Sequence, residues 1–292
     1  MRRGLVLAHH DPAGIVDPHV VHALGHYRRH ADHVTLVSTA ARRLPPAAAD
    51  LVDAFIPREN VGYDFCSWRA GLDALPDRTE FDELVLVNDS VYGPLSDLAP
   101  AFSDPRVADA DCWGMCLSAQ DPRSRRTPAR PHLQSWFVVF RRVVVESGAF
   151  RIFWEGVEPL ATKAAIVDRY EVGMSERLAA AGFRLAALYD ATRAARPTVA
   201  RALRHLSPAE PLRSWRLIRK LGAARCGWHN PSEAGCEALL EAGVPFIKTS
   251  VFRVNHYGLD RRILMRRIAA CPAYDPALVE GHLRRLAAAG PG

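Results

Sequence analysis

The chain has 292 residues, of which 49% are hydrophobic and 24% are charged. These values are typical of a globular protein and exclude a disordered, collagen-like or coiled-coil chain. No apolar stretch approaches the roughly 18 residues that a transmembrane helix needs. The apolar run after Met1 is too short for a signal peptide, so we expect a cytoplasmic protein whose six cysteines are reduced and mostly buried.

The net charge is +6, and all but three of the 38 basic residues are arginine. Arginine and alanine richness has two interpretations, a GC-rich genome or an anionic partner such as nucleotide phosphates, nucleic acid or an anionic membrane surface. The chain lacks the aromatic-interleaved basic motifs of RNA-binding modules, so nucleic acid is the weakest of these partners.

Strands and helices are predicted to alternate through the first two thirds of the chain. Short apolar runs predict strands, and amphipathic spacing predicts helices. Asp17 and Pro18 are typical of a helix start. The run Glu83–Asn88 is apolar almost throughout, as in a strand buried on both faces. The predicted strands are 5–8, 34–37, 54–56, 83–88, 111–117, 135–140 and 183–188, and the predicted helices are 16–30, 64–75, 144–156 and 171–181.

The amino-acid composition changes after Asp190. Residues 191–225 are rich in arginine and alanine and predict a helical linker or basic surface helices. A compact unit follows, in which Ser232 is the predicted cap of a helix that ends near Ala242, and an amphipathic tail begins at Asp260. We therefore expect an α/β fold with a mainly parallel sheet in residues 1–190, and a smaller helical unit in residues 191–292 that packs on it.

The first candidate motif is residues 59–72, between a predicted strand and helix. Ligands of open α/β sheets bind at the carboxyl ends of strands, near helix N-termini. Gly62 permits close approach of a ligand to the backbone, and Asn60 and Asp64 offer polar groups to a base or ribose. The alternative interpretation is a turn followed by Asp64 as a helix cap.

The second motif is Asn88-Asp89-Ser90, at the end of the buried strand. A carboxylate there could bind Mg²⁺ or Mn²⁺ between protein and diphosphate, since these ions often need only one or two protein carboxylates. The alternative is an Asx turn that closes the strand.

Two further motifs complete the set. Residues 132–137 follow a loop with arginines at 123, 125, 126 and 130, which could cover an anionic substrate or be solvated. Glu171 lies at a predicted helix start. Its carboxylate could be stabilised there by the helix dipole or, if it faces a cleft, act as a general base.

Four histidines recur along one predicted helix, at positions 19, 22, 26 and 30. Helical histidine pairs can bind metal. No nearby carboxylate or cysteine completes a convincing site from this helix, so we expect a solvated helix face.

Taken in order, these motifs resemble the rhamnan synthesis protein F family of bacterial polysaccharide biosynthesis. The resemblance covers about residues 4–260. The matching segments are 59–72, 87–94, 113–115, 132–140, 150–155, 170–178, 230–231 and 243–248, with Asn255. The resemblance implies a GT-A-like glycosyltransferase fold, in which a DxD-like motif ends a central strand and a later acidic motif supplies the base.

The resemblance also implies roles for individual residues. Asp89 would ligate Mg²⁺ or Mn²⁺, although residues 88–90 have one carboxylate where DxD has two. Glu171 would deprotonate the acceptor, although position 172 is valine rather than an acid. The residues assigned to nucleotide-sugar binding are Asn60, Gly62, Tyr63, Asp64, Asn88, Ser90, His132 and Gln134.

The implied reaction is transfer of a deoxyhexose, with rhamnose from dTDP-L-rhamnose as the expected donor, to a growing polysaccharide, lipopolysaccharide or glycolipid. Inversion requires one base on the acceptor and charge stabilisation of the departing diphosphate. Lys248 and Arg253 become candidates for that stabilisation if the C-terminal unit folds back onto the cleft. A glycan or lipid-linked acceptor implies peripheral contact with the inner face of the plasma membrane. The alternative function is a non-catalytic glycan-binding or assembly module.

Overall fold

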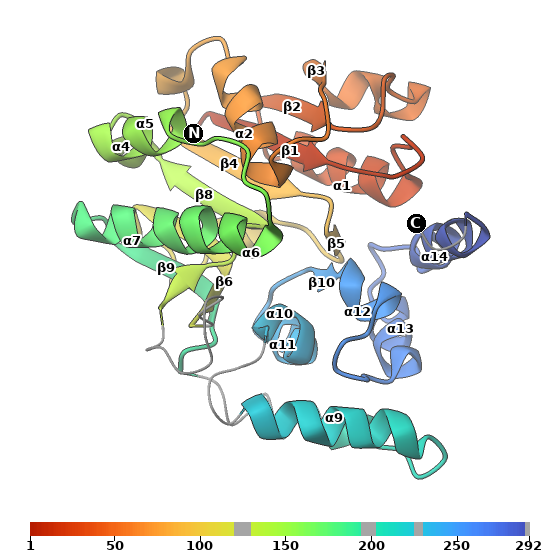
Figure 1. The fold of residues 1–292 in the computed structure, drawn as a ribbon. Helices are drawn as coiled ribbons and strands as arrows, with labels where there is room; N and C mark the ends of the chain where they lie inside the picture. The colour runs from red at the N-terminus through yellow and green to blue at the C-terminus, as the bar shows by residue number, and fades with distance from the viewer. Residues whose placement is uncertain (120–129, 194–202, 225–229, 290–292) are drawn as a thin grey trace.

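The computed structural model describes residues 1–119, 130–193, 203–224 and 230–289 (Figure 1). A large mixed sheet runs through it in the order β3-β2-β1-β4-β8-β6-β7, with β9 pairing β6. Four of its strand pairings are parallel (β1 with β2 and β4, β2 with β3, β6 with β9), and three are antiparallel. The predicted α/β class with a mainly parallel sheet is confirmed.

The strands of this sheet are β1 (Arg3–His9), β2 (His33–Ser38), β3 (Ala54–Pro57), β4 (Glu83–Asn88), β6 (Cys112–Ser118), β7 (His132–Leu133), β8 (Phe137–Arg141) and β9 (Leu185–Asp190). A second, two-stranded sheet pairs β5 (Val91–Tyr92) with β10 (Ile247–Lys248). All seven predicted strands are present; β5, β7 and β10 are too short for a periodicity to reveal them.

Alternation along the strands buries both faces of the sheet. On β1, Leu5 and Leu7 join a core with α1 (Pro18–Arg28), whereas Val6 and Ala8 join the opposite core with α2 (Tyr63–Asp73). The second core also takes in α4 (Arg142–Val145), α5 (Gly148–Glu155), α6 (Lys163–Ile166) and α7 (Gly173–Ala180). The predicted helix 144–156 is therefore two helices.

The C-terminal unit packs against the first core. Its helices are α9 (Pro211–Ala224), α10 (Pro231–Ala234), α11 (Cys236–Glu241), α12 (Thr249–Arg253), α13 (Arg261–Ala269) and α14 (Ala277–Ala288). Leu239 and Phe246 share a core with the sheet, and β10 pairs with β5. The helix cap is Asn230, which accepts a hydrogen bond from the Ser232 backbone, so the prediction of Ser232 as the cap is wrong.

Two other predicted caps differ from the structure. Asp17 occupies the N-cap position of α1 but makes no cap hydrogen bond, because its carboxylate is bonded to Arg285 on α14. Helix α2 begins at Tyr63 after Gly62, which is left-handed, so Asp64 lies inside the first turn. Among the described cysteines, four are buried and Cys271 is half-buried, as predicted.

Gly62 is required by the local backbone. Its φ is +78°, and a Cβ built there would lie 2.2 Å from Cys66 Sγ. What approaches Gly62 closely is thus the first turn of α2 and Pro159, not a ligand, which corrects the role predicted from the sequence.

We predict that Gly62→Ala lowers the free energy of unfolding by at least about 1 kcal/mol, because a left-handed conformation alone costs that much in an L-residue. The matched control is Gly25→Ala in α1, where an added Cβ meets nothing within 4 Å. Removing a glycine from a helix interior should stabilise by about 0.5–1 kcal/mol. Urea unfolding measures both variants; equal effects would contradict the prediction.

Candidate active site

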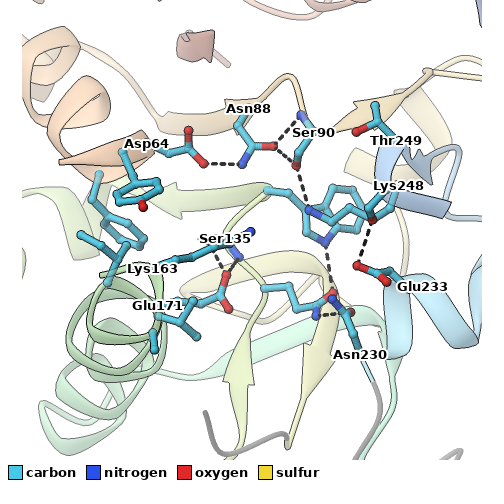
Figure 2. A pocket seen from close by; sticks show the side chains of 18 of the residues that line it. Asp64, Asn88, Ser90, Ser135, Lys163, Glu171, Asn230, Glu233, Lys248 and Thr249 are labelled. Atoms are coloured by element: carbon cyan, nitrogen blue, oxygen red, sulfur yellow. Dashed lines mark hydrogen bonds between the residues drawn. The ribbon is translucent and has the colours of Figure 1, made fainter. Parts of the chain in front are cut away.

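A cavity of about 730 Å³ opens between the carboxyl end of β4 and the C-terminal unit (Figure 2). Ligand pockets commonly span about 300–1,000 Å³. Its polar lining comes from α2, the end of β4, β7 and the turn after it, the helix that begins at Lys163, and α10, β10 and α12 of the C-terminal unit. The charged and polar side chains that line it are Tyr63, Asp64, Asn88, Ser90, His132, Gln134, Ser135, Lys163, Glu171, Asn230, Glu233, Lys248, Thr249, Ser250, Arg253 and His256.

A chain of hydrogen bonds crosses one wall of this cavity (Figure 2). Lys248 Nζ donates to Ser90 Oγ at 2.8 Å, and Ser90 Oγ donates to Asn88 Oδ1 at 2.5 Å. Asn88 Nδ2 in turn donates to Asp64 Oδ2 at 2.9 Å. The four residues come from three elements, so the chain ties β10 of the C-terminal unit to β4 and α2.

Lys248 is a half-buried residue of the site whose ammonium group is desolvated. Burial lowers its pKa to about 8, and the nearby carboxylates of Glu171, Asp64 and Glu233 oppose that shift. Its ammonium also lies 5.5 Å from the centre of the Trp136 ring, within cation–π range. At neutral pH the cavity therefore holds a positive charge that is poorly solvated and available to an anion.

Glu171 lies on the opposite wall. Its Oε2 accepts hydrogen bonds from Ser135 N at 2.8 Å and Ser135 Oγ at 2.5 Å. Its Oε1 lies 3.7 Å from His132 Nε2. His132 Nδ1 is 2.7 Å from the Arg130 carbonyl, which can only accept, so Nδ1 carries the hydrogen. The carboxylate is thus fixed through one oxygen and keeps the other for the cavity.

The backbone around Glu171 differs from the predicted helix start. Glu171 belongs to η3, a π-helical segment (Val167–Val172) between α6 and α7, within one helical stretch that begins after the Thr162 cap. The helix-dipole interpretation therefore does not apply. Insertions of π-helix are frequent at functional sites.

A second pocket of about 180 Å³ adjoins the cavity at the carboxyl ends of β1 and β4. The two share the lining residues Asp64, Ser90, Thr249 and Arg253. The strand order reverses between β1 and β4, since β2 and β3 extend one way and β8 the other. This is the topological switch point at which open α/β sheets bind ligands.

Asp89 lines this second pocket and not the larger cavity, so it does not share a wall with Glu171. Its Oδ2 accepts a hydrogen bond from His10 N at 2.8 Å and lies 3.9 Å from His9 Nε2. Burial, with a further contribution from the charge of Asp64, raises the pKa of Asp89 to about 7.

Asp64 and Asp89 suit a hard divalent cation. Both are carboxylates on the second pocket, burial raises the pKa of each, and repulsion by the charge of Asp64 adds to the shift at Asp89. Mg²⁺ and Mn²⁺ take oxygen ligands and would relieve this repulsion.

Most of the predicted site residues come together. Of the residues predicted for the site, those that line the larger cavity are Tyr63, Asp64, Asn88, Ser90, His132, Gln134 and Glu171. Asn60 is exposed and lines neither pocket, and Gly62 is buried beneath α2. Residues 120–129 of the predicted arginine loop lie outside the described residues, and Arg130 is bonded to Asp168 and Glu176.

The sequence offered Lys248 and Arg253 as conditional candidates, and the condition is met because β10 and α12 fold onto the cavity. Ser135, Lys163, Asn230 and Glu233 were missed as lining residues. Asn230 accepts a hydrogen bond from Gln134 at 2.9 Å, and Glu233 accepts one from Ser250 at 2.9 Å. An available signal was that residues 230–231 and 243–248 fall within the motifs of the resemblance.

The prediction of a solvated histidine face is wrong. His19 and His26 are buried, and His19 stacks on His282 of α14 with ring centroids 4.3 Å apart. Asp17, His19 and His282 bring ligand atoms within 4.8 Å of one another. The guanidinium of Arg285, however, is bonded to Asp17, and the Tyr92 hydroxyl lies 2.8 Å from His282 Nδ1, so two of the three groups already have partners. We assign this cluster to holding α14 against α1.

Comparison with known proteins now adds to this geometry, which is that of an α/β protein with a polar cavity at its switch point. Residues 37–208 match the family described as rhamnan synthesis protein F. The match covers more than half of the chain, and the chain belongs to this family.

Curated relatives match over parts of their length. "Virulence protein VirA" of Vibrio anguillarum is 26% identical over 211 residues, covering 70% of this chain and 64% of the relative. "Uncharacterized protein y4gN" of Sinorhizobium fredii is 28% identical over 135 residues, covering 46% of this chain and 34% of the relative. The chain thus spans between about a third and two thirds of these relatives.

Three solved structures align with parts of this chain at low sequence identity. A CMP:2-keto-3-deoxy-manno-octonic acid synthetase bound to CTP aligns with a TM-score of 0.37 and 11% identity, over 65% of this chain and 90% of that one. The WbbM bifunctional glycosyltransferase aligns with a TM-score of 0.35 and 12% identity, over 64% of this chain and 38% of that one. The glycosyltransferase GlyE of Streptococcus pneumoniae aligns with a TM-score of 0.35 and 12% identity, over 64% of this chain and 45% of that one.

Across the described residues, no helix has the length and apolarity to cross a membrane.

Because the chain has three lysines, the Lys248 ammonium can be titrated directly. We predict that, after reductive ¹³C-methylation, the resonance that disappears in Lys248→Arg titrates with a midpoint of about 8. The shift arises because burial disfavours the charged form. A midpoint near the ordinary lysine value of about 10.4 would contradict the burial of this amine.

Proposed function

We propose that this protein is a glycosyltransferase that transfers a hexose from a nucleotide-sugar to a glycan. The observation that carries the proposal is the pairing of a fixed carboxylate, Glu171, with a buried cation, Lys248, in one cavity at the switch point of a rhamnan synthesis protein F family fold. Glycosyl transfer to a hydroxyl needs a base and a group that stabilises the leaving diphosphate.

The proposed base is Glu171. Ser135 holds its Oε2 with two hydrogen bonds, which orients Oε1 without consuming it. When an acceptor hydroxyl attacks the anomeric carbon, its proton passes to the carboxylate, and the bond to the diphosphate breaks. Inversion at the anomeric carbon follows if this attack is a single displacement.

The proposed diphosphate ligand is Lys248, supported by Ser90, Thr249 and Arg253. The last three line both pockets, so a donor lying across the switch point would contact all of them. Bringing phosphate oxygens to Lys248 replaces its missing solvation with a charged partner. The leaving group is thereby stabilised where its charge develops.

Asp64 and Asp89 would hold Mg²⁺ or Mn²⁺ if the reaction uses one. Such an ion supplies Lewis-acid stabilisation of a diphosphate. We propose dTDP-L-rhamnose as the donor and a polysaccharide, lipopolysaccharide or glycolipid as the acceptor, following the family's name and the resemblance of the motifs.

We predict that Glu171→Gln lowers kcat about 100- to 10,000-fold, the range for loss of a general base, with little change in donor binding. Glutamine can still accept both Ser135 hydrogen bonds through its carbonyl oxygen. The control is Glu155→Gln, an exposed glutamate on α5. Product formation from a nucleotide-sugar measures turnover. Full activity in Glu171→Gln would remove the proposed base, and binding without turnover in the wild type would favour a glycan-binding module.

We also predict that a nucleotide-sugar raises the melting temperature, because a ligand that binds only the native state stabilises it. The screen uses dTDP-, UDP- and GDP-sugars with and without Mn²⁺. Asp89→Asn should lose the Mn²⁺-dependent part of the shift. Absence of any shift across the screen would contradict the proposal.

Donor affinity should fall as the pH rises through about 8, because Lys248 then loses its proton and its charge. In Lys248→Met the affinity should be weaker below that pH and flat across it. Isothermal titration with the best nucleotide tests this; an unchanged pH profile in Lys248→Met would assign the diphosphate to another group.

A further inference from the structure

Helix α9 presents large apolar side chains to solvent. Leu212 is 83% exposed, Trp215 is 58% exposed and Ile218 is 53% exposed. They recur every three residues, which keeps them on one side of a helix. Figure 1 shows α9 at the lower margin of the molecule, with the rest of the fold on one side of it.

The orientation of α9 is fixed by its inner face. Leu217 is fully buried in the core of the C-terminal unit. Arg213 donates to the carbonyl oxygens of His205 at 2.6 Å and Gly258 at 2.9 Å. At 100° per residue, Trp215 and Arg219 lie opposite Leu217, so the exposed side chains point away from the protein as a consequence of this anchoring.

The outer face is cationic as well as apolar. Residues 211–224 contain no acidic residue, whereas positions 213, 216, 219 and 220 are basic. Arg213 pairs with Glu210 on the inner side. Arg216 and Arg219 belong to the outer face, and the Arg219 guanidinium lies 4.8 Å above the Trp215 ring. Apolar and cationic groups are therefore interleaved on one surface.

The apolar surface continues beside the helix. Leu203 and Leu206, which are 47% and 37% exposed, flank the residue that Arg213 holds. Ser207 and Ser214 exchange hydrogen bonds at 2.9 Å, which keeps this segment against α9. The segment that precedes α9 thus exposes leucine side chains as well.

We propose that α9 binds the surface of an anionic phospholipid membrane, lying in the interface plane. Leucine, isoleucine and tryptophan would enter the boundary between headgroups and acyl chains, and arginine stems would cover apolar area while their charges meet lipid phosphates. Basic residues close to such a surface strengthen binding, because they are attracted to the anionic headgroups. A second copy of the chain fits less well, because a twofold contact through this face would bring the arginines of both copies, at 216 and 219, into one interface while residues 211–224 offer no acidic partner.

This inference goes beyond glycosyl transfer and does not need it, since lipid binding is measured without turnover. If the proposed function also holds, the same contact would bring the cavity to lipid-linked acceptors. The two proposals can fail separately. A protein that binds no vesicles can still bind a nucleotide-sugar, and a protein that binds no nucleotide-sugar can still bind vesicles.

The test is co-sedimentation of the full chain with vesicles of phosphatidylcholine alone and with added phosphatidylglycerol. We expect binding to the anionic vesicles, weakened at least about tenfold in Arg216→Glu/Arg219→Glu and in Leu212→Ser/Trp215→Ser/Ile218→Ser. The matched control is Arg151→Glu/Ile152→Ser on α5, where both side chains are also exposed. Circular dichroism melts confirm that each variant folds.

Trp215 provides a direct reporter. The other described tryptophans, at 68, 113, 136 and 154, are at most 3% exposed. Anionic vesicles should shift the emission to the blue, and Trp215→Phe should bind while losing that shift. The proposal is overturned if the wild type binds neither kind of vesicle, or if the α9 variants bind vesicles as the wild type does. It is also overturned if the α9 substitutions change only the self-association of the chain, measured by light scattering.

Discussion

The ammonium of Lys248, held out of water against the polar end of β4, is the contact on which the site depends. An unpaired buried charge is costly, and here the compensation comes from Ser90, the Trp136 ring and the carboxylates of Glu171, Asp64 and Glu233. None of these neighbours lies in the C-terminal unit except Glu233. Lys248 can therefore be buried only when β10 pairs with β5, and the same pairing closes the cavity.

The sequence predicted what local patterns determine. β4 begins and ends at the predicted residues, and Pro18 begins α1 as predicted. On β4, Leu84 and Val85 face opposite cores, which is why its nearly uninterrupted apolar run could be interpreted as a strand buried on both faces. Side chains at the ends of such strands gather at one edge, so Asn88 and Ser90 could be placed in a site from the sequence.

What the sequence could not give were contacts between distant segments. The histidines of α1 form a polar stripe that is typical of a solvated face, but α14 covers it with His282 and Arg285 some 260 residues later. The sequence alone favours Asp17 as a helix cap, because the distant Arg285, which binds its carboxylate in the structure, cannot be foreseen from a local pattern. Glu171 was placed at a helix start because the apolar spacing begins there, whereas the helix begins earlier, at a cap on Thr162, and is widened by a π-helical segment.

The C-terminal unit thus carries two surfaces on one small core. Phe252 and Leu217 are both buried in that core, the first on the helix that lines the cavity and the second under α9. When α9 is held in one orientation, α12 and β10 are therefore held with it, because a close-packed core transmits a displacement of one helix to its neighbours. The position of the cavity relative to any surface that α9 binds is consequently set by the core that α9 and α12 share.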